Sequence, residues 1–233
     1  MLVRYAGQDY NLPMKLPWRS RVETPGPEMI PLEPPPGPVI EVYSSPGLEE
    51  TLRGTPDDGK CKVLDLGPSV ADNVEFVSSF ASYLQIVDAM NRDPSASGLE
   101  GVGIGRLSAL QALIDEHRRS FSLVLMWDVL NYLSIDQAER LIQSVAELCL
   151  PGARLHTIVF ATDTMAAIPN RYRIIDNARI AYEVATTEQL GAPNLAPAAV
   201  GKLLQGFRVE HSFVLQHGVR EYVASRKRWY PKK

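Results

Sequence analysis

Three acidic residues stand at or near the ends of short apolar runs in this sequence: Asp65, Asp88 and Asp128. Asp88 lies 23 residues after Asp65. In folds that bind nucleosides, an acid about 20 residues past the first turn accepts hydrogen bonds from both hydroxyl groups of a ribose. We therefore predict that Asp88 binds a ribose, and the functional interpretation depends on this residue more than on any other.

Residues next to these acids could complete such a site. Gly67 has no side chain, so the backbone could approach a ligand closely. Met90 offers a flexible apolar contact for a base. Simpler interpretations remain open, because an Asp at the end of a strand often only caps the following turn and Trp127 in a central strand can belong to the core. Their joint placement favours a binding site.

The elements that must position these residues follow from the pattern after Cys61. Short apolar runs alternate with helical patterns, which is typical of parallel strands joined by crossover helices. Two final runs, 207–216 and 219–226, are separated only by His217-Gly218, which indicates an antiparallel hairpin. The expected strands are 62–66, 83–87, 122–127 and 155–160, with a weak strand at 101–105, and the expected helices are 72–80, 107–117 and 136–148. A Pro151-Gly152 turn is expected before the strand at 155.

The prolines are concentrated at the beginning of the chain. Of the 18 prolines, eleven lie at or before Pro56, and proline cannot donate to a sheet or helix. We predict an N-terminal extension over residues 1–44 and one domain over 45–233. The extension is either a surface tail or a segment that docks on the body or on a second subunit, so it could support a homo-oligomer. A helix is expected after Ser45 as its cap, stopped by Gly54.

The amino-acid composition limits the classes of partner that we expect this chain to bind. With 24 Lys and Arg against 27 Asp and Glu, the chain has no global positive field, so nucleic acid is not an expected partner. The basic end from Arg226 is better interpreted as a solvated tail than as an RNA contact. No apolar run is long enough to span a membrane. Two cysteines suggest a reducing compartment, and we predict a soluble, cytoplasmic protein. The histidines 156, 211 and 217 lack metal-ligand spacing, so no metal is predicted.

Several segments together resemble the class I S-adenosylmethionine-dependent methyltransferases. Residues 63–71 with Asp88 are similar to the cofactor-binding half of that family, and residues 125–133 with 148–153 are similar to its fourth strand and the turn into its fifth. The resemblance covers about residues 45–228. It implies an α/β fold, a three-layer αβα sandwich with a mostly parallel seven-stranded sheet and an antiparallel C-terminal strand. The cofactor-binding residues that it implies, together with those argued above, are Asp65, Gly67, Ser69, Asp88, Ala89, Met90, Trp127, Asp128 and Asn131.

The family's glycine loop is altered here. Its acid-x-Gly-x-Gly-x-Gly pattern reads Asp65-x-Gly67-x-Ser69-x-Ala71, and Tyr132 stands where the family often carries histidine. Ser and Ala restrict the positive dihedrals that glycine allows. Gly101-Val102-Gly103-Ile104-Gly105 only superficially suggests a phosphate loop, because no convincing strand precedes it.

The resemblance implies an S-adenosylmethionine-dependent methyltransferase that modifies a small-molecule acceptor. The acceptor would be recognised by residues 161–205, where Asp163 and Tyr172 are candidates for a catalytic base. A non-catalytic methyltransferase-like binding or scaffold module is the alternative, motivated by the altered loop. A nicotinamide-dependent oxidoreductase is disfavoured, because Asp72 occupies the place of the third small residue of the dinucleotide pattern.

Overall fold

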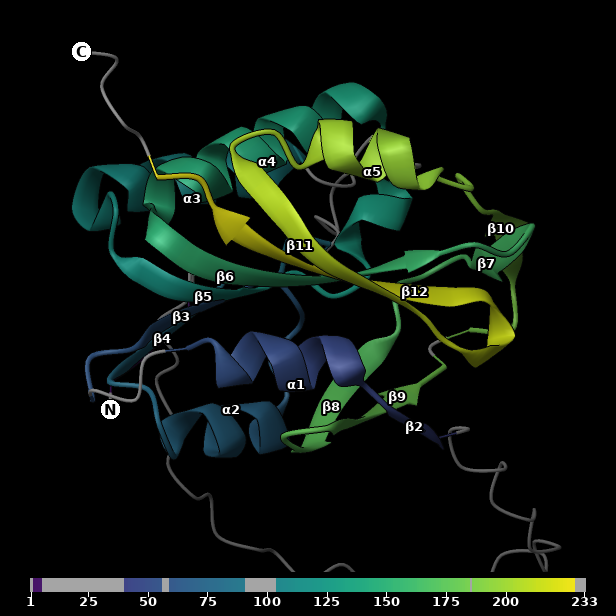
Figure 1. Cartoon of the computed structure of the whole chain (residues 1–233), viewed down its shortest axis with the longest axis horizontal. Coiled ribbons are helices and arrows are strands. Elements are labelled where there is room, and N and C mark those ends of the chain that lie inside the picture. Colours follow the sequence, from purple (N-terminus) through teal and green to yellow (C-terminus); the bar gives the residue numbers. More distant parts are fainter. Residues whose placement is uncertain (1, 6–39, 56–58, 91–103, 185, 229–233) are drawn as a thin grey trace, which may run out of the picture.

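The computed structural model describes residues 2–5, 40–55, 59–90, 104–184 and 186–228. Its centre is a sheet in the order β1-β4-β3-β5-β6-β12-β11, shown in Figure 1. Five strands are parallel neighbours: β1 (Leu2–Tyr5), β4 (Tyr83–Ile86), β3 (Lys62–Asp65), β5 (Phe121–Leu125) and β6 (Cys149–Phe160). The strand β12 (Val219–Arg226) is antiparallel to both β6 and β11 (Phe207–Val214). The predicted α/β fold with a mostly parallel sheet is confirmed.

Helices cover both faces of the sheet. Figure 1 shows α3 (Ile104–His117), α4 (Ile135–Leu148) and α5 (Pro197–Leu203) on one face, and α1 (Pro46–Arg53) and α2 (Ala71–Ser78) on the other. Each face has its own cluster of buried apolar side chains. The long helix α4 begins with a reciprocal capping box between Ser134 and Gln137, which satisfies two backbone donors that a helix start leaves open.

The helix α1 begins at its predicted cap and is fixed by a buried carboxylate. Ser45 accepts from the backbone N–H of Leu48 and donates to Glu221, and the N–H of Gly47 donates to Glu221 Oε2 over 2.7 Å. Burial raises the pKa of Glu221, but contacts with His156, Ser45 and Gly47 outweigh it and lower that pKa. A carboxylate at a helix N-terminus also complements the helix dipole. Glu221 therefore ties α1 to β12, next to the edge strand β11.

Residues that follow β6, together with the earlier strand β2, build two smaller sheets. One pairs β7 (Thr164–Ala166) with β10 (Gln189–Gly191), and the other has the order β2-β9-β8, from Ile40–Ser44, Arg179–Glu183 and Arg171–Asp176. All their pairings are antiparallel. The strands β1 and β2 both lie within the predicted N-terminal extension, and they pair with β4 and β9. The boundary at residue 45 stays a prediction.

Some expected element bounds are wrong. The weak strand predicted at 101–105 is contradicted at Ile104 and Gly105, which begin α3, while residues 101–103 lie outside the described part. The turn predicted at Pro151-Gly152 lies inside β6, where the pairing with β5 shifts register. The final hairpin turns through a short 3-10 helix at Gln216–Gly218 rather than through two residues. None of the described helices is long and apolar enough to cross a membrane.

Candidate functional site

A cavity of about 740 Å³ opens at the carboxyl ends of β3, β4 and β5. Parallel α/β sheets bind their ligands at this end, and a volume of this size is typical of small-molecule sites. Six of the predicted binding residues line it: Gly67, Asp88, Met90, Trp127, Asp128 and Asn131. The small sheet β7-β10 contributes Met165 and Leu190 to its outer wall. Figure 1 shows β7 and β10 at the end of the sheet away from the last residues of β12.

Other predicted residues lie outside the lining. Ala89 is buried in the core, and Ser69 borders a separate hollow of about 230 Å³ beside β8 and β9. Asp65 is buried below the floor of the cavity. Asp163 is exposed on the connection between β6 and β7, and its side chain does not line the cavity.

The carboxylate of Asp88 lies at the rim of this cavity, just after β4. The backbone N–H of Met90 donates to Asp88 Oδ1 over 3.1 Å, forming a local turn that orients the side chain. The side chain is only partly buried, and both Asp88 and Met90 line the cavity. An acceptor carboxylate and an apolar thioether thus stand side by side at this rim.

Trp127 forms the floor of the cavity in a strained conformation. Its backbone φ is 52°, in the left-handed region that a bulky residue rarely adopts. The indole Nε1–H donates to Asp65 Oδ1 over 2.7 Å, and the N–H of Gly67 donates to the same oxygen over 2.9 Å. Strained backbone of this kind clusters at functional sites and persists only where surrounding contacts enforce it.

Gly67 is required here for packing against the indole. A Cβ at Gly67 would lie 2.6 Å from Trp127 Cδ1 and 2.7 Å from its Nε1. The space that glycine leaves on this side is therefore filled by the protein itself. Gly67 still borders the cavity with its backbone, but the expected room for a ligand at its missing side chain is taken by Trp127.

Tyr172 connects this floor to Asp128. Its ring stacks on Trp127, with centroids 5.3 Å apart and planes 4° apart. Its hydroxyl donates to Asp128 Oδ2 over 3.0 Å, and the N–H of Asn170 reaches the same oxygen over 3.4 Å. Burial and the nearby Asp128 raise the pKa of Tyr172 well above its usual value. Tyr172 thus holds its proton at neutral pH, which argues against the predicted role of this residue as a base.

Asp128 and Asp65 are the two carboxyl groups whose acidity the site changes most. Burial raises the pKa of Asp128 to about 7, against the smaller opposing effect of the Tyr172 bond. Burial also raises the pKa of Asp65 to about 6, although bonds from Gly67 and Trp127 lower it. A carboxyl group that titrates near neutral pH can accept or release a proton during a reaction. Asp128 lines the cavity and Asp65 does not, so Asp128 is the candidate for such a role.

Asp128→Asn removes the buried carboxyl group, so the effect of this substitution on stability is expected to depend on pH. The pKa of Asp128 in the folded protein lies above its unfolded value of 3.8. The contribution of this group to the free energy of unfolding of the wild type is therefore fully present at low pH and is lost as the pH rises toward 7. The difference in free energy of unfolding, variant minus wild type, should therefore grow by up to about 1.4 kcal/mol per pH unit across this window. Urea denaturation at several pH values measures it. Asp115→Asn, which makes the same chemical change at an exposed position of α3, is the matched control. A difference for Asp128→Asn that does not change with pH would contradict the expected titration.

Several residues that line the cavity have a role or a position that the sequence does not predict. The amide of Asn131 donates to the carbonyls of Asp128 and Ile158 and accepts from the N–H of Phe160. Its side chain therefore braces the site. Arg171 and Glu183, partners in the register of β8 and β9, also line the cavity. No local pattern in the sequence places Glu183 opposite Arg171.

The fold and the cavity define an α/β protein with a ligand site at the carboxyl ends of its parallel strands. No protein-family model and no curated protein matches the sequence. Solved structures with partial similarity to this chain include S-adenosylmethionine-dependent methyltransferases.

Three of these structures illustrate the likeness. The Burkholderia thailandensis 1,6-didemethyltoxoflavin-N1-methyltransferase, with bound 1,6-didemethyltoxoflavin and S-adenosylhomocysteine, is 18% identical with a TM-score of 0.46, covering 78% of this chain and 77% of that one. A Mesorhizobium loti S-adenosylmethionine-dependent methyltransferase is 15% identical with a TM-score of 0.44, covering 76% and 96%. The N-methyltransferase NodS from Bradyrhizobium japonicum WM9, in complex with S-adenosylhomocysteine, is 16% identical with a TM-score of 0.42, covering 78% and 88%. All three TM-scores are below 0.5, so the functional proposal below rests on the chain's own residues.

Proposed function

We propose that this chain is an S-adenosylmethionine-dependent methyltransferase that transfers a methyl group to a small-molecule acceptor. The observation that carries the proposal is the joint position of Asp88, Met90 and Gly67 around one cavity at the carboxyl ends of the parallel strands. A carboxylate suits a ribose diol, and a thioether suits the face of an adenine. The volume of about 740 Å³ leaves room for a cofactor and a small acceptor together.

The residues present fit this cofactor at its nucleoside end. Asp88 would accept from the ribose hydroxyls and Met90 would pack on the base. The backbone of Gly67 and Pro68 would border the amino-acid end, while Asp65 stays below, bound to Trp127 and Gly67. Asp65 thus supports the loop indirectly. The cofactor brings a methyl group on a sulfonium centre, which is already activated for transfer.

What the chain must supply is positioning and the exclusion of water. The apolar side chains Met165, Ile168 and Leu190 face the cavity from the β7-β10 region. They would shield the acceptor from solvent. Asp128 would hold or remove a proton of the acceptor, because its pKa lies near 7, and Tyr172 would fix the orientation of that carboxylate through its 3.0 Å hydrogen bond.

Calorimetric titration with S-adenosylhomocysteine tests the proposal. We expect saturable binding with one site per chain, because Asp88 and Met90 adjoin at the rim of the cavity. A protein that remains folded and releases no heat with this ligand over a range of temperatures would refute the proposal.

A non-catalytic binding module is the second candidate, and one observation favours it. The indole of Trp127 fills the space beside Gly67, so the altered glycine loop is packed against protein on that side. Under this alternative the cavity binds a small molecule other than the cofactor, and methyl transfer does not occur. Binding of S-adenosylhomocysteine would count against the alternative, and failure to bind it would support it.

A further inference from the structure

A second pocket lies at the end of the sheet away from the candidate active site. It has a volume of about 610 Å³ and is formed where β6 begins, β11 begins and β12 ends. Its lining is Gly54, Gly152, Arg154, Arg208, Glu210, Ser225, Arg226, Lys227 and Arg228. Five of these nine residues are cationic and only one is acidic, although the whole chain carries a net charge of -3.

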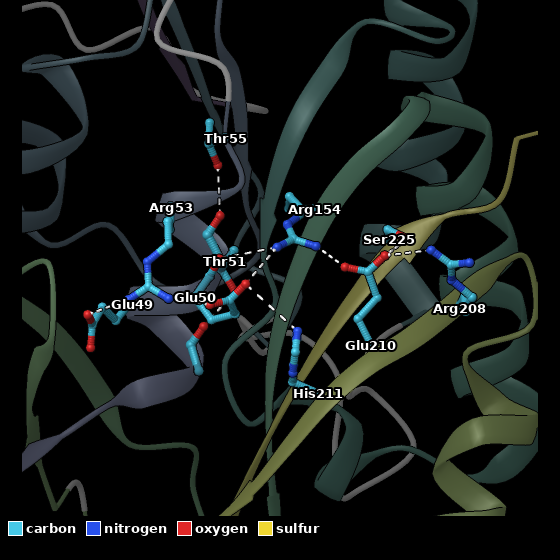
Figure 2. A network of polar contacts seen from close by, with 11 residues as sticks. Glu49, Glu50, Thr51, Arg53, Thr55, Arg154, Arg208, Glu210, His211 and Ser225 are labelled. Carbon is cyan, nitrogen blue, oxygen red and sulfur yellow. Dashed lines mark hydrogen bonds and ion pairs between the residues drawn. The ribbon is translucent and has the colours of Figure 1, made fainter.

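Part of this charge is neutralised within the protein. Figure 2 shows Arg154 between two carboxylates: it pairs with Glu210 on one side and, over 3.3 Å, with Glu50 on the other. Arg208 pairs with the second oxygen of Glu210 over 2.9 Å, and Ser225 donates to that oxygen over 2.6 Å. This network links α1 to β6 and β11, so a purely structural role explains Arg154, Arg208 and the two glutamates.

It does not explain the three cations at the end of β12. Arg226 donates through Nε and Nη1 to the backbone carbonyls of Ala146 and Gly206, over 2.9 and 2.7 Å. Its charge thus meets no carboxylate among the ion pairs of the described residues. Lys227 and Arg228 follow it, and both are exposed with no ion pair to a described residue. The pocket therefore has five cations against Glu210 and the neighbouring Glu50, an excess of three positive charges.

Arg154, which lines the pocket, has a guanidinium group whose hydrogen bonds are only partly satisfied by the described residues. Only 11% of its side chain is exposed, and its Nε has no hydrogen-bond partner among the described residues. A buried guanidinium donor without a partner costs free energy unless something accepts from it. Gly54 leaves space for this group, because a Cβ there would lie 2.3 Å from Nε.

We propose that this basic pocket is a binding site for a small anion that carries two or more phosphate groups. Guanidinium groups pair with phosphate oxygens through parallel hydrogen bonds, and cations on neighbouring positions match the closely spaced charges of linked phosphates. The volume exceeds what one phosphate needs. The site stands apart from the cavity at the other end of the sheet, and the proposal holds whether or not the chain transfers methyl groups.

Titration with inorganic tripolyphosphate at low ionic strength tests this site. We expect saturable binding that weakens with added salt, because bound phosphates displace counterions. The double variant Lys227→Ala/Arg228→Ala should bind about tenfold more weakly. These exposed side chains make no described ion pair, so the fold should be preserved.

The matched control is Arg140→Ala/Lys202→Ala. These residues are exposed on α4 and α5 and away from the pocket lining, and their loss changes the net charge by the same amount. Its affinity should stay within about twofold of the wild type. The proposal is overturned if the wild type does not bind tripolyphosphate, or if both double variants weaken binding equally. It is also overturned if a single-stranded DNA oligomer binds and tripolyphosphate does not displace it. Titration with S-adenosylhomocysteine should give the same affinity in both double variants and the wild type.

Discussion

Asp88→Asn is expected to weaken the binding of S-adenosylhomocysteine by about 10- to 100-fold. The substitution preserves the size of the side chain and an oxygen that can accept from the N–H of Met90, the bond that the structure shows at 3.1 Å. It removes the negative charge and replaces one acceptor oxygen by a donor. A ribose diol bound by both carboxylate oxygens would lose one charge-assisted hydrogen bond.

Calorimetry on the folded variant measures this effect, with unfolding curves as a check on integrity. The side chain of Asp88 is partly exposed, so the free energy of unfolding should change by less than about 0.5 kcal/mol. Asp115→Asn, which makes the same chemical change at an exposed position of α3, should leave the affinity unaltered. If Asp88→Asn binds as tightly as the wild type, then Asp88 does not hold the ribose and the proposed orientation of the cofactor is wrong.

The parts of the fold that the sequence predicts well are those with local signals. Ser45 and Gly54 bound α1 as expected, because capping depends on residues only a few positions apart. The apolar run before Trp127 is a buried strand between β3 and β6, as its composition indicates. The acid after β4 lies at the cavity because the carboxyl ends of parallel strands meet at one edge of a sheet.

The walls of the cavity depend on contacts between distant segments, and local patterns do not encode these. Tyr172 reaches Asp128 across 44 positions and Trp127 reaches Asp65 across 62. The strand β2 comes from the proline-rich beginning of the chain and pairs with β9, about 140 residues further on. The sequence therefore predicts the segment 161–205 as the place for acceptor recognition, but it does not predict the two small sheets to which this segment contributes strands.

Gly67 illustrates how a residue predicted for the site can have a further role in packing. Glycine after the first strand suggested close approach to a ligand, and the residue does border the cavity. The structure adds that the indole of Trp127 occupies the space where a side chain would stand. Neither the spacing nor the composition of residues 63–71 indicates a partner 60 positions away. The floor of the site is thus set by packing among side chains, which only the folded chain defines.

Trp127→Ala is expected to lower the free energy of unfolding by about 3–5 kcal/mol, the range for large-to-small changes of buried aromatic residues. The indole is 2% exposed, donates to Asp65 and stacks on Tyr172. Its removal leaves a cavity and takes one donor from a buried carboxylate. Alanine would also inherit a left-handed backbone conformation, where φ is 52°.

A second substitution tests whether Gly67 and Trp127 act as one unit. Gly67→Ala should lower the free energy of unfolding by about 1–3 kcal/mol, because the new methyl group overlaps the indole. In the Trp127→Ala background the same change should cost far less, since the overlapping ring is gone. The control is Gly201→Ala in α5, where a Cβ meets nothing within 4 Å. This substitution should stabilise the helix by about 0.5–1 kcal/mol. Urea denaturation of the four members of the cycle and the control gives all these values. If Gly67→Ala lowers the free energy of unfolding equally in both backgrounds, the two residues are not coupled. In that case the indole does not fix the floor of the cavity through this glycine.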